Sequence, residues 1–437
     1  MAAARVIDVQ EFIDTHPFSA VQRQTLALCF LVVALDGFDV AIVGHIAPAL
    51  RAEWGLAVDR LGALFAAGLF GLMVGSFIVG PLGDRFGRKT MLVTSVVCFG
   101  AACMASAFSS GITSLTWLRF LTGLGLGGAM PTAITLTSEY SPTPRQASLV
   151  TVMFCGFTIG SAIGGLAAAQ IVTAYGWRPL LVGGGLLPLL LAPVLARALP
   201  ESARYLVSKD GESSRVQATL KRIAPDADLA GASFSGRRVS TSSPVSELFG
   251  PTRLAGTVLL WISFFMSLLV VYLLSNWMPT LIQRSGLSLR GASLITATFQ
   301  LGGTMGAIAL GRLMDRFNPY RILGIAYLMA AGFVSLMGAA AAIPWIMTVA
   351  VFGAGFCVSG GQVGANALTA AFYPTSCRTT GVSWALGAGR SGSVVGSFLG
   401  GVMLAQGWSL GTVYGVVAVP VLISGAAILA LGFRSSR

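Results

Sequence analysis

Long apolar runs separated by short polar stretches recur along the whole chain. Six lie near residues 25–50, 60–83, 90–108, 113–139, 146–173 and 177–199, and six more near 254–281, 291–314, 319–338, 343–372, 378–404 and 408–433. A transmembrane α-helix needs about 20 predominantly apolar residues, and each run supplies roughly that number. The pattern predicts an all-α integral membrane protein with twelve transmembrane helices in two pseudo-symmetric six-helix halves.

The polar stretches between the runs mark the domains that we expect. These are a cytoplasmic N-terminal tail over 1–24, the first half over 25–199, a cytoplasmic linker over 200–253, the second half over 254–433 and a cytoplasmic C-terminal tail over 434–437. The N-terminal tail is either solvated or a short amphipathic helix. The linker is polar and Ser-rich, which is typical of a flexible connection.

Composition and charge agree with a protein that spans a membrane. Hydrophobic residues make up 55% of the 437 positions and charged residues 10%, which leaves too little polar surface for a soluble domain. Most of the 28 Lys and Arg lie on the side of the two termini; the exceptions are Arg51, Arg60, Arg178, Arg284 and Arg290 on the other side, and Arg119 and Arg390 within spans. This positive-inside bias predicts cytoplasmic termini and explains the net charge of +12 without a nucleic-acid partner.

Two acids lie in the first apolar run, where ionised groups are costly. Asp36 and Asp39 share one face of a helix, and Asp36 lies about 17 Å from a membrane surface at Thr25. An ionised Asp at mid-depth costs roughly 2.5–3.5 kcal/mol, so we expect the pair to exchange protons. Arg119, in the fourth run, lies at the depth of Asp39, which predicts a partner from the first span. His45 either relays protons or hydrogen-bonds a neighbouring helix.

A charged, glycine-containing loop follows the second run. Residues 80–89 read Gly-Pro-Leu-Gly-Asp-Arg-Phe-Gly-Arg-Lys, which combines tight-turn residues with Asp84, Arg85 and Arg88. Such charged side chains form charge-assisted bonds across helix ends. The stretch resembles the short cytoplasmic loop motif of major facilitator superfamily transporters, which implies that these residues gate a central site.

The second half repeats the first, as expected for internal repeats with a substrate site at mid-membrane between them. The loop is repeated at Asp315, which corresponds to Asp84. Arg378 corresponds to Arg145, and the two pairs are separated by nearly the same number of residues. Glu139, at the end of the fourth run, is placed to lock Arg88 or Arg145 in one conformation. The gating residues that we expect are Asp84, Arg85, Arg88, Glu139, Arg145, Asp315, Arg316 and Arg378.

Arg390 marks a difference between the halves. Twelve residues after Arg145 stands Phe157, whereas twelve after Arg378 stands Arg390, about 18 Å into the eleventh run. Its planar guanidinium suits a carboxylate, so Arg390 either binds an anionic substrate or pairs with the first-span acids or Glu139. Other groups near this depth are either substrate contacts or packing residues: Phe157, Asn276, Trp277, Gln300, Gln362, Asn366 and Trp384. Together they predict a pocket for a small aromatic anion.

Three motifs carry a closer resemblance. The stretches 36–39 (Asp-Gly-Phe-Asp), 361–368 (Gly-Gln-Val-Gly-Ala-Asn-Ala-Leu) and 373–392 resemble the aromatic acid:proton symporters across essentially all twelve spans. The resemblance implies a bacterial inner-membrane protein that carries benzoate, hydroxybenzoate or a related acid inward with protons. It also implies roles for Asp36, Asp39, Arg119, Glu139, Arg378 and Arg390. Ser397, where the family has Pro, and Asn318 depart from its pattern.

The sequence thus predicts a proton-coupled importer of a small aromatic carboxylate that works by alternating access. The alternative with the same fold is a symporter of a non-aromatic acid such as muconate or a sugar acid; a drug:proton exporter and a membrane sensor are further rivals. The chain shows no catalytic constellation and no metal-ligand spacing, and its six Cys are expected to pack as small apolar residues. We expect a monomer in the bilayer with the proton as coupling ion and no other cofactor.

Overall fold

The computed structural model describes residues 6–208, 213–229, 231–235, 248–250, 253–339, 343–373 and 378–435. Its first half contains α2 (Ala20–Trp54), α3 (Val58–Phe86), α4 (Arg88–Ser106), α5 (Ile112–Glu139), α6 (Gln146–Tyr175) and α7 (Arg178–Ala198). Its second half contains α11 (Leu254–Arg284), α12 (Leu289–Arg316), α13 (Pro319–Ala339), α14 (Pro344–Ala354), α15 (Gly360–Phe372), α16 (Arg378–Ala405) and α17 (Leu410–Ser435). A π-helical turn, Gly355–Ser359, joins α14 and α15 into one span.

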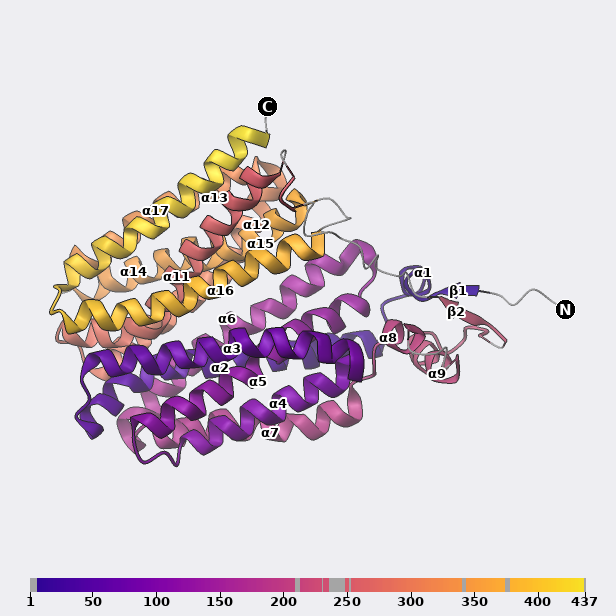
Figure 1. Ribbon diagram of the computed structural model, residues 1–437, viewed down its shortest axis with the longest axis horizontal. Helices are drawn as coiled ribbons and strands as arrows, with labels where there is room; N and C mark the ends of the chain where they lie inside the picture. Colours follow the sequence, from indigo (N-terminus) through magenta and orange to yellow (C-terminus); the bar gives the residue numbers. More distant parts are fainter. Residues whose placement is uncertain are drawn as a thin grey trace.

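The helix count matches the pattern of apolar runs. Within the described residues, 11 helical segments are long and apolar enough to cross a membrane. The helix α16, with 28 residues, is the remaining long one. Each half therefore contributes six spans, and the two halves form two bundles that lie side by side (Figure 1).

Close helix packing within each half depends on small residues at the crossings. The strongest contacts in the first half join α3 to α5 and α2 to α6. A methyl group added at Gly160 of α6 would collide with the backbone carbonyl of Ala34 in α2. Backbones can approach this closely only where a side chain is absent, and such approach drives helix association in lipid.

The halves meet near one end of the molecule and diverge toward the other (Figure 1). We call the end that bears α1 (Val9–Thr15), α8 (Ala203–Ser208) and α9 (Ser213–Ile223) the linker side, and the opposite end the far side. The halves touch through α3 and α16, α6 and α12, and α2 and α11.

Contacts between the halves close the far side. The rings of Phe65 on α3 and Trp277 on α11 meet edge to face, with centroids 5.0 Å apart. A methyl group at Gly62 of α3 would lie 3.2 Å from the carbonyl oxygen of Phe398 on α16. Both contacts lie in the far-side half of their helices, so the structure is closed at that end and splayed at the linker side.

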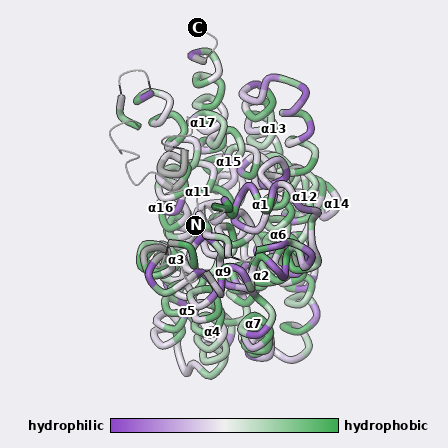
Figure 2. The backbone as a smooth tube through the Cα atoms, turned by 90° about the vertical axis from the view of Figure 1, so that its right-hand side faces the viewer, coloured by the Kyte–Doolittle hydropathy of each residue, from purple (hydrophilic) through white to green (hydrophobic). Residues whose placement is uncertain are grey.

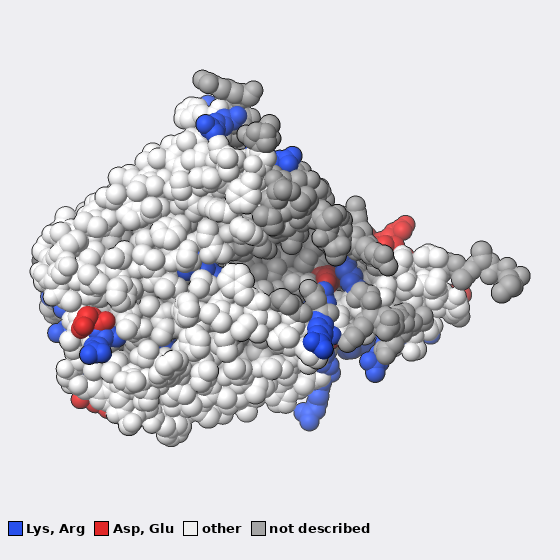
Figure 3. Space-filling view, viewed as in Figure 1, with Lys and Arg blue, Asp and Glu red and all other residues white. Residues whose placement is uncertain are grey.

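The lateral surface is apolar, as a bilayer requires. Large hydrophobic side chains such as Phe77, Phe108 and Trp117 are among the most exposed. Figure 2 shows that hydrophobic residues dominate along the helices of the bundle. Figure 3 shows charged side chains gathered at the two ends of the visible face, with a few basic atoms in the crease between the halves. The chain is therefore a multi-pass membrane protein.

Part of the N-terminal tail is folded against the linker. The strand β1 (Val6–Asp8) pairs in parallel with β2 (Ser233–Ser235), so that Val6 lies opposite Ser233. The helix α1 follows directly and buries Val9 and Ile13 in the cluster that contains the apolar face of α9. Of the two alternatives for the tail, the structure shows the short amphipathic helix, preceded by a strand, within the described residues 6–15.

The first transmembrane helix begins at Ala20, five residues before the start of the apolar run. Ser19 and Gln22 form a capping box, in which each side chain satisfies the backbone N–H of the other. Polar residues with these spacings extend a helix beyond its hydrophobic stretch, which explains the earlier start. The linker likewise contains α8, α9 and β2 within the stretch that the sequence predicts to be flexible.

Candidate functional site

Arg119 of α5 and Asp39 of α2 form an ion pair in the first half. One guanidinium nitrogen lies 3.1 Å from Asp39 Oδ1, and the second contacts Asp39 Oδ2. The side chains are 4% and 0% exposed. A two-pronged Arg–carboxylate contact is the strongest form of charge-assisted hydrogen bonding. It confirms the predicted pairing of Arg119 with an acid of the first span.

A third group completes this pair. Arg119 also lies 3.8 Å from the sulfur of Cys103 on α4, and the Cys103 thiol points to the carbonyl oxygen of Leu181 on α7 at 3.5 Å. Two further helices of the first half, α4 and α7, thus help to hold the cation next to Asp39. Arg119 remains charged in any protein environment, so it acts as the buried counter-ion of the Asp39 carboxylate.

Asp36 lies one helical turn from Asp39 but has a different environment. It is 1% exposed, and within the described part of the chain neither carboxylate oxygen has a hydrogen-bond partner. The neighbouring backbone is tightly packed: Ser161 of α6 donates to the Gly37 carbonyl at 2.8 Å, and the backbone of Phe157 lies against Gly37. Asp36 is therefore held in place without any group that would stabilise its charge by hydrogen bonding.

Arg390 of α16 crosses from the second half to the first. Its guanidinium donates to the hydroxyl of Ser76 on α3, and Ser76 also bonds the Gly127 carbonyl of α5 at 2.8 Å. Among the described residues, no carboxylate lies within ion-pair distance of Arg390. Asp36 and Tyr272 of α11 are the groups that act on it electrostatically. Arg390 is thus a cation between the halves whose hydrogen-bonded partner is a neutral serine.

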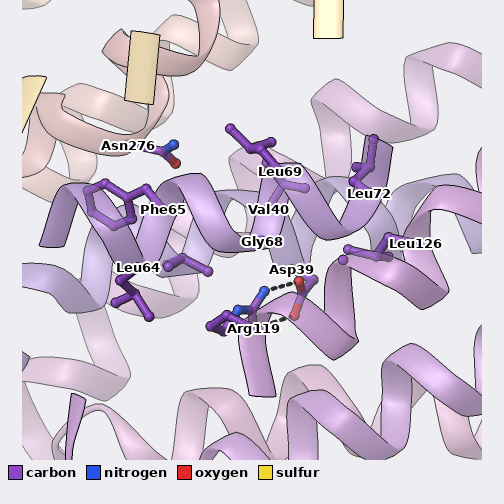
Figure 4. A pocket seen from close by; sticks show the side chains of 12 residues that line it. Asp39, Val40, Leu64, Phe65, Gly68, Leu69, Leu72, Arg119, Leu126 and Asn276 are labelled. Atoms are coloured by element: carbon purple, nitrogen blue, oxygen red, sulfur yellow. Dashed lines mark hydrogen bonds and ion pairs between the residues drawn. The ribbon is translucent and has the colours of Figure 1, made fainter. Parts of the chain in front are cut away.

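A cavity lies beside the Asp39–Arg119 pair and reaches the second half at Asn276 (Figure 4). Asp39 and Arg119 lie on one side of it, and Asn276 of α11 lies on the other. Phe65 and Leu69 of α3 line the apolar wall between them. A small molecule with an apolar body and a few polar groups fits such a lining.

The predicted pocket residues of the second half have several different partners. Asn276 donates to the Ser397 hydroxyl at 2.8 Å, and the indole of Trp277 donates to the Ser397 carbonyl at 2.7 Å. Gln300 of α12 lies 3.5 Å from the Ser275 hydroxyl, at the limit of a hydrogen bond. Ser397, the departure from the family pattern, therefore anchors α11 to α16.

The other candidates lie nearer the linker side. Gln362 and Asn366, one turn apart on α15, contact each other at 3.5 Å. Trp384 of α16 is 43% exposed and stacks on Trp261 of α11 with ring centroids 5.7 Å apart. Phe157 packs against the apolar cluster of the first half. The structure gives these four side chains no contact with the Asp39–Arg119 pair.

The predicted gating residues are only partly brought together. Arg88 lies 3.9 Å from Glu139, so that of the two cations expected near Glu139 it is Arg88 that pairs with it. The Arg85 carbonyl accepts from Tyr205 of α8. Arg145, Asp315 and Arg316 have exposed side chains, and those of Asp84 and Arg378 lie outside the described part of the structure.

His45, for which the sequence allows either a proton relay or a hydrogen bond to a neighbouring helix, lies buried on α2. It is buried against Gly165 of α6, with Nε2 3.0 Å from the position of a methyl group there. Within the described residues, Nδ1 has no hydrogen-bond partner. The ring thus fills space at the far-side contact between the halves.

Sequence reasoning missed four residues of the site. Ser76 and Ser397 are partners of predicted residues, and Cys103 and Tyr272 lie beside the charged groups. Ser76 and Cys103 carry no signal of their own, because serine and cysteine are common in membrane helices, whereas Ser397 stands out only as a departure from the family pattern. The lone tyrosine of α11 at the depth of Arg390 was a usable signal.

The fold and the site define a secondary transporter, and comparisons agree with this class. The family model of the Major Facilitator Superfamily matches residues 29–292 and 260–437. The 4-hydroxybenzoate transporter PcaK of Pseudomonas aeruginosa is 45% identical over 438 residues, which cover 100% of this chain and 98% of that protein. The gallate transporter of Pseudomonas putida is 42% identical over 438 residues, covering 99% and 96%.

A solved structure shares the fold. The xylose transporter XylE from E. coli, in a partially occluded inward open conformation, superposes with a TM-score of 0.75 at 18% identity, covering 93% of this chain and 98% of that one. The chain belongs to the major facilitator superfamily, and the predicted superfamily and twelve-helix fold are confirmed.

Proposed function

We propose that this protein is a proton-coupled symporter that imports a small aromatic carboxylate such as 4-hydroxybenzoate. The observation that carries the proposal is Arg390, a cation between the two halves with a neutral hydroxyl as its partner. A half-buried cation between the halves without a counter-ion is costly, so such a position favours an anion supplied by the substrate. The names of the full-length relatives, which are transporters of hydroxylated aromatic acids, support the same substrate class.

The cavity beside the Asp39–Arg119 pair suits the ring of an aromatic acid. Phe65 and Leu69 offer apolar surface for a ring, and Asn276 offers a polar group at the opposite wall. One N–H of the Asn276 amide donates to Ser397, which leaves its second N–H and its amide oxygen for a substrate hydroxyl. We propose that five other side chains shape the cavity or the path to it and do not contact the substrate directly: Gln300, Gln362, Asn366, Trp277 and Trp384.

The acids of α2 supply the coupling. A proton taken up by the Asp36 and Asp39 pair neutralises one of two buried charges, and Arg119 holds Asp39 in place. Import of a monovalent anion with protons avoids moving a net negative charge through a low-dielectric region.

Alternating access follows from the closed far side and the splayed linker side. We place the linker side in the cytoplasm of a bacterial inner membrane, with both termini there, because most basic residues lie on that side. The structure then corresponds to the inward-facing state. Arg88 and Glu139, with Asp84, Arg85, Arg145, Asp315, Arg316 and Arg378, form the cytoplasmic gates that rearrange when the far side opens.

Competition for uptake tests this proposal. Labelled 4-hydroxybenzoate is added outside proteoliposomes that contain the full chain, together with an excess of one unlabelled acid, and its uptake is measured. We expect hydroxybenzoate, gallate and benzoate to compete, and muconate and sugar acids to leave uptake unchanged. Competition by aliphatic acids but not by aromatic ones would assign the protein to the alternative substrate class.

A further inference from the structure

The two acids of α2 have unequal environments, and this inequality bears on which of them moves a proton. Asp39 is held by both nitrogens of Arg119, which itself is fixed by Cys103. Protonating Asp39 would leave a buried guanidinium without its counter-ion, which is strongly unfavourable. Asp39 therefore stays ionised in this conformation.

Asp36, in contrast to Asp39, has no cation bonded to it within the described residues. Both of its oxygens are buried, and within the described residues neither accepts a hydrogen bond. An ionised carboxylate in such a place lacks every compensation that buried charges require. The neutral acid is the form that fits the site as it stands.

A cation that has no carboxylate partner among the described residues lies across the interface between the halves. Arg390 is bonded to Ser76, and Asp36 is among the groups within its electrostatic reach. An Asp36 carboxylate and a substrate carboxylate would both be attracted to this guanidinium. The two anions are chemically equivalent, and a single guanidinium fork accommodates one carboxylate in bidentate geometry.

We infer that Asp36 alone carries the coupled proton, and that its carboxylate and the substrate carboxylate are alternative counter-ions of Arg390. This inference rests on the proposed function. A proton from outside converts Asp36 to the neutral acid and frees Arg390 for the substrate. After the substrate leaves to the cytoplasm, Asp36 releases the proton to water on that side, and its carboxylate turns to Arg390. Asp39 and Arg119 remain paired throughout.

The groups that face Asp36 are few, which makes its titration interpretable. Asp39 lies on the same helix, Arg390 on α16 and Tyr272 on α11. The helix α6, which packs along α2, contains no Asp, Glu, Lys, Arg or His. The phenol of Tyr272 stays neutral at physiological pH, so Asp36 and Arg390 are the pair whose charge balance changes.

Substrate affinity as a function of pH tests the inference. Binding of labelled 4-hydroxybenzoate is measured on the purified full chain, over the pH range in which its carboxyl group is ionised and its phenol is not. As the pH rises and Asp36 loses its proton, its carboxylate takes Arg390, so the wild-type Kd increases by up to about tenfold per pH unit. Asp36→Asn removes this slope and abolishes accumulation driven by a proton gradient.

Two further variants complete the test. The folded fraction of Asp39→Asn keeps the slope, and Asp59→Asn, which removes an exposed carboxylate at the far-side start of α3, behaves as wild type. Asp36→Ser replaces Asp36→Asn if the latter does not fold. A slope that persists without Asp36, or that vanishes without Asp39, would overturn the assignment and leave the transporter proposal intact. Absence of binding to the wild type at every pH would overturn both.

Discussion

Gly44 of α2 packs directly against the backbone of Ser275 on α11, in the opposite half of the protein. A methyl group at Gly44 would lie 2.6 Å from the Ser275 carbonyl oxygen, closer than any ordinary contact. The two residues lie in the far-side portion of their helices, so the absent side chain is what lets the far side close. The first prediction concerns this contact.

Gly44→Ala should shift the protein toward the state that is open at the far side. Overpacking of this kind costs about 1–3 kcal/mol, and the cost falls on the closed conformation only. Spin labels at Arg51→Cys and Arg284→Cys, on the far-side ends of α2 and α11, report the change when the native cysteines are replaced. We expect longer distances in Gly44→Ala. Gly183→Ala, where a methyl group meets nothing within 4 Å, should leave them unchanged.

The Arg119–Asp39 pair should show strong non-additivity in stability. Removing either partner by Asp39→Asn or Arg119→Gln leaves an uncompensated buried charge and should lower the free energy of unfolding by about 3–5 kcal/mol. The double variant removes both charges and should recover much of this loss. Thermal unfolding in detergent measures all four proteins. Equal and additive losses would show that the two side chains do not depend on each other.

Ser397 should matter for the seam between α11 and α16. Its hydroxyl accepts from Asn276, and Ser397→Ala leaves that buried amide without a partner, which costs about 1–3 kcal/mol. Ser114→Ala removes a hydroxyl that bonds locally at the exposed start of α5 and serves as the control. The difference is read from the unfolding midpoint. A midpoint for Ser397→Ala equal to that of the control would argue against this anchor.

Docking of the N-terminal segment, residues 6–15, should depend on pH through Asp14. Partial burial raises the pKa of Asp14, but hydrogen bonds from the Thr143 backbone amide and hydroxyl and from Gln10 outweigh it, so the pKa lies below the ordinary value. A depressed Asp pKa stabilises the folded form above the unfolded pKa, and this contribution is lost as the pH falls through the folded pKa.

Hydrogen exchange of residues 6–15 measures this docking. We expect protection at neutral pH that fades below the usual range of Asp. Asp14→Asn should lower protection at neutral pH and remove the pH dependence. Glu11→Gln, on the same helix and exposed, is the matched control. Protection that does not change in Asp14→Asn would mean that the apolar face of α1 alone holds the segment.

Much of the fold follows from local pattern, because each span must satisfy its backbone hydrogen bonds internally and so is visible as one apolar run. The Asp39–Arg119 pair was predictable for a similar reason, since buried charges at one depth must find each other. The bond from Arg390 to Ser76 was not, because a neutral serine in the other half leaves no charge signal.

Long-range pairing of irregular segments also escaped prediction. The strands β1 and β2 flank the first half in the sequence, before and after its six spans, and three-residue strands carry no periodicity. The early start of α2 depends on Ser19 and Gln22, whose polarity places them outside the apolar run. Hydropathy locates the membrane-spanning helices, whereas helix capping and strand pairing depend on individual hydrogen bonds that a hydropathy pattern does not contain.

Uptake driven by an imposed proton gradient is the most direct test of the account. Proteoliposomes containing the full chain are supplied with labelled 4-hydroxybenzoate at equal concentration on both sides, with the exterior more acidic. We predict accumulation inside above the external concentration, its collapse on addition of a protonophore, and its loss in Arg390→Gln. Accumulation that is unaffected by the gradient or by Arg390→Gln would contradict the account.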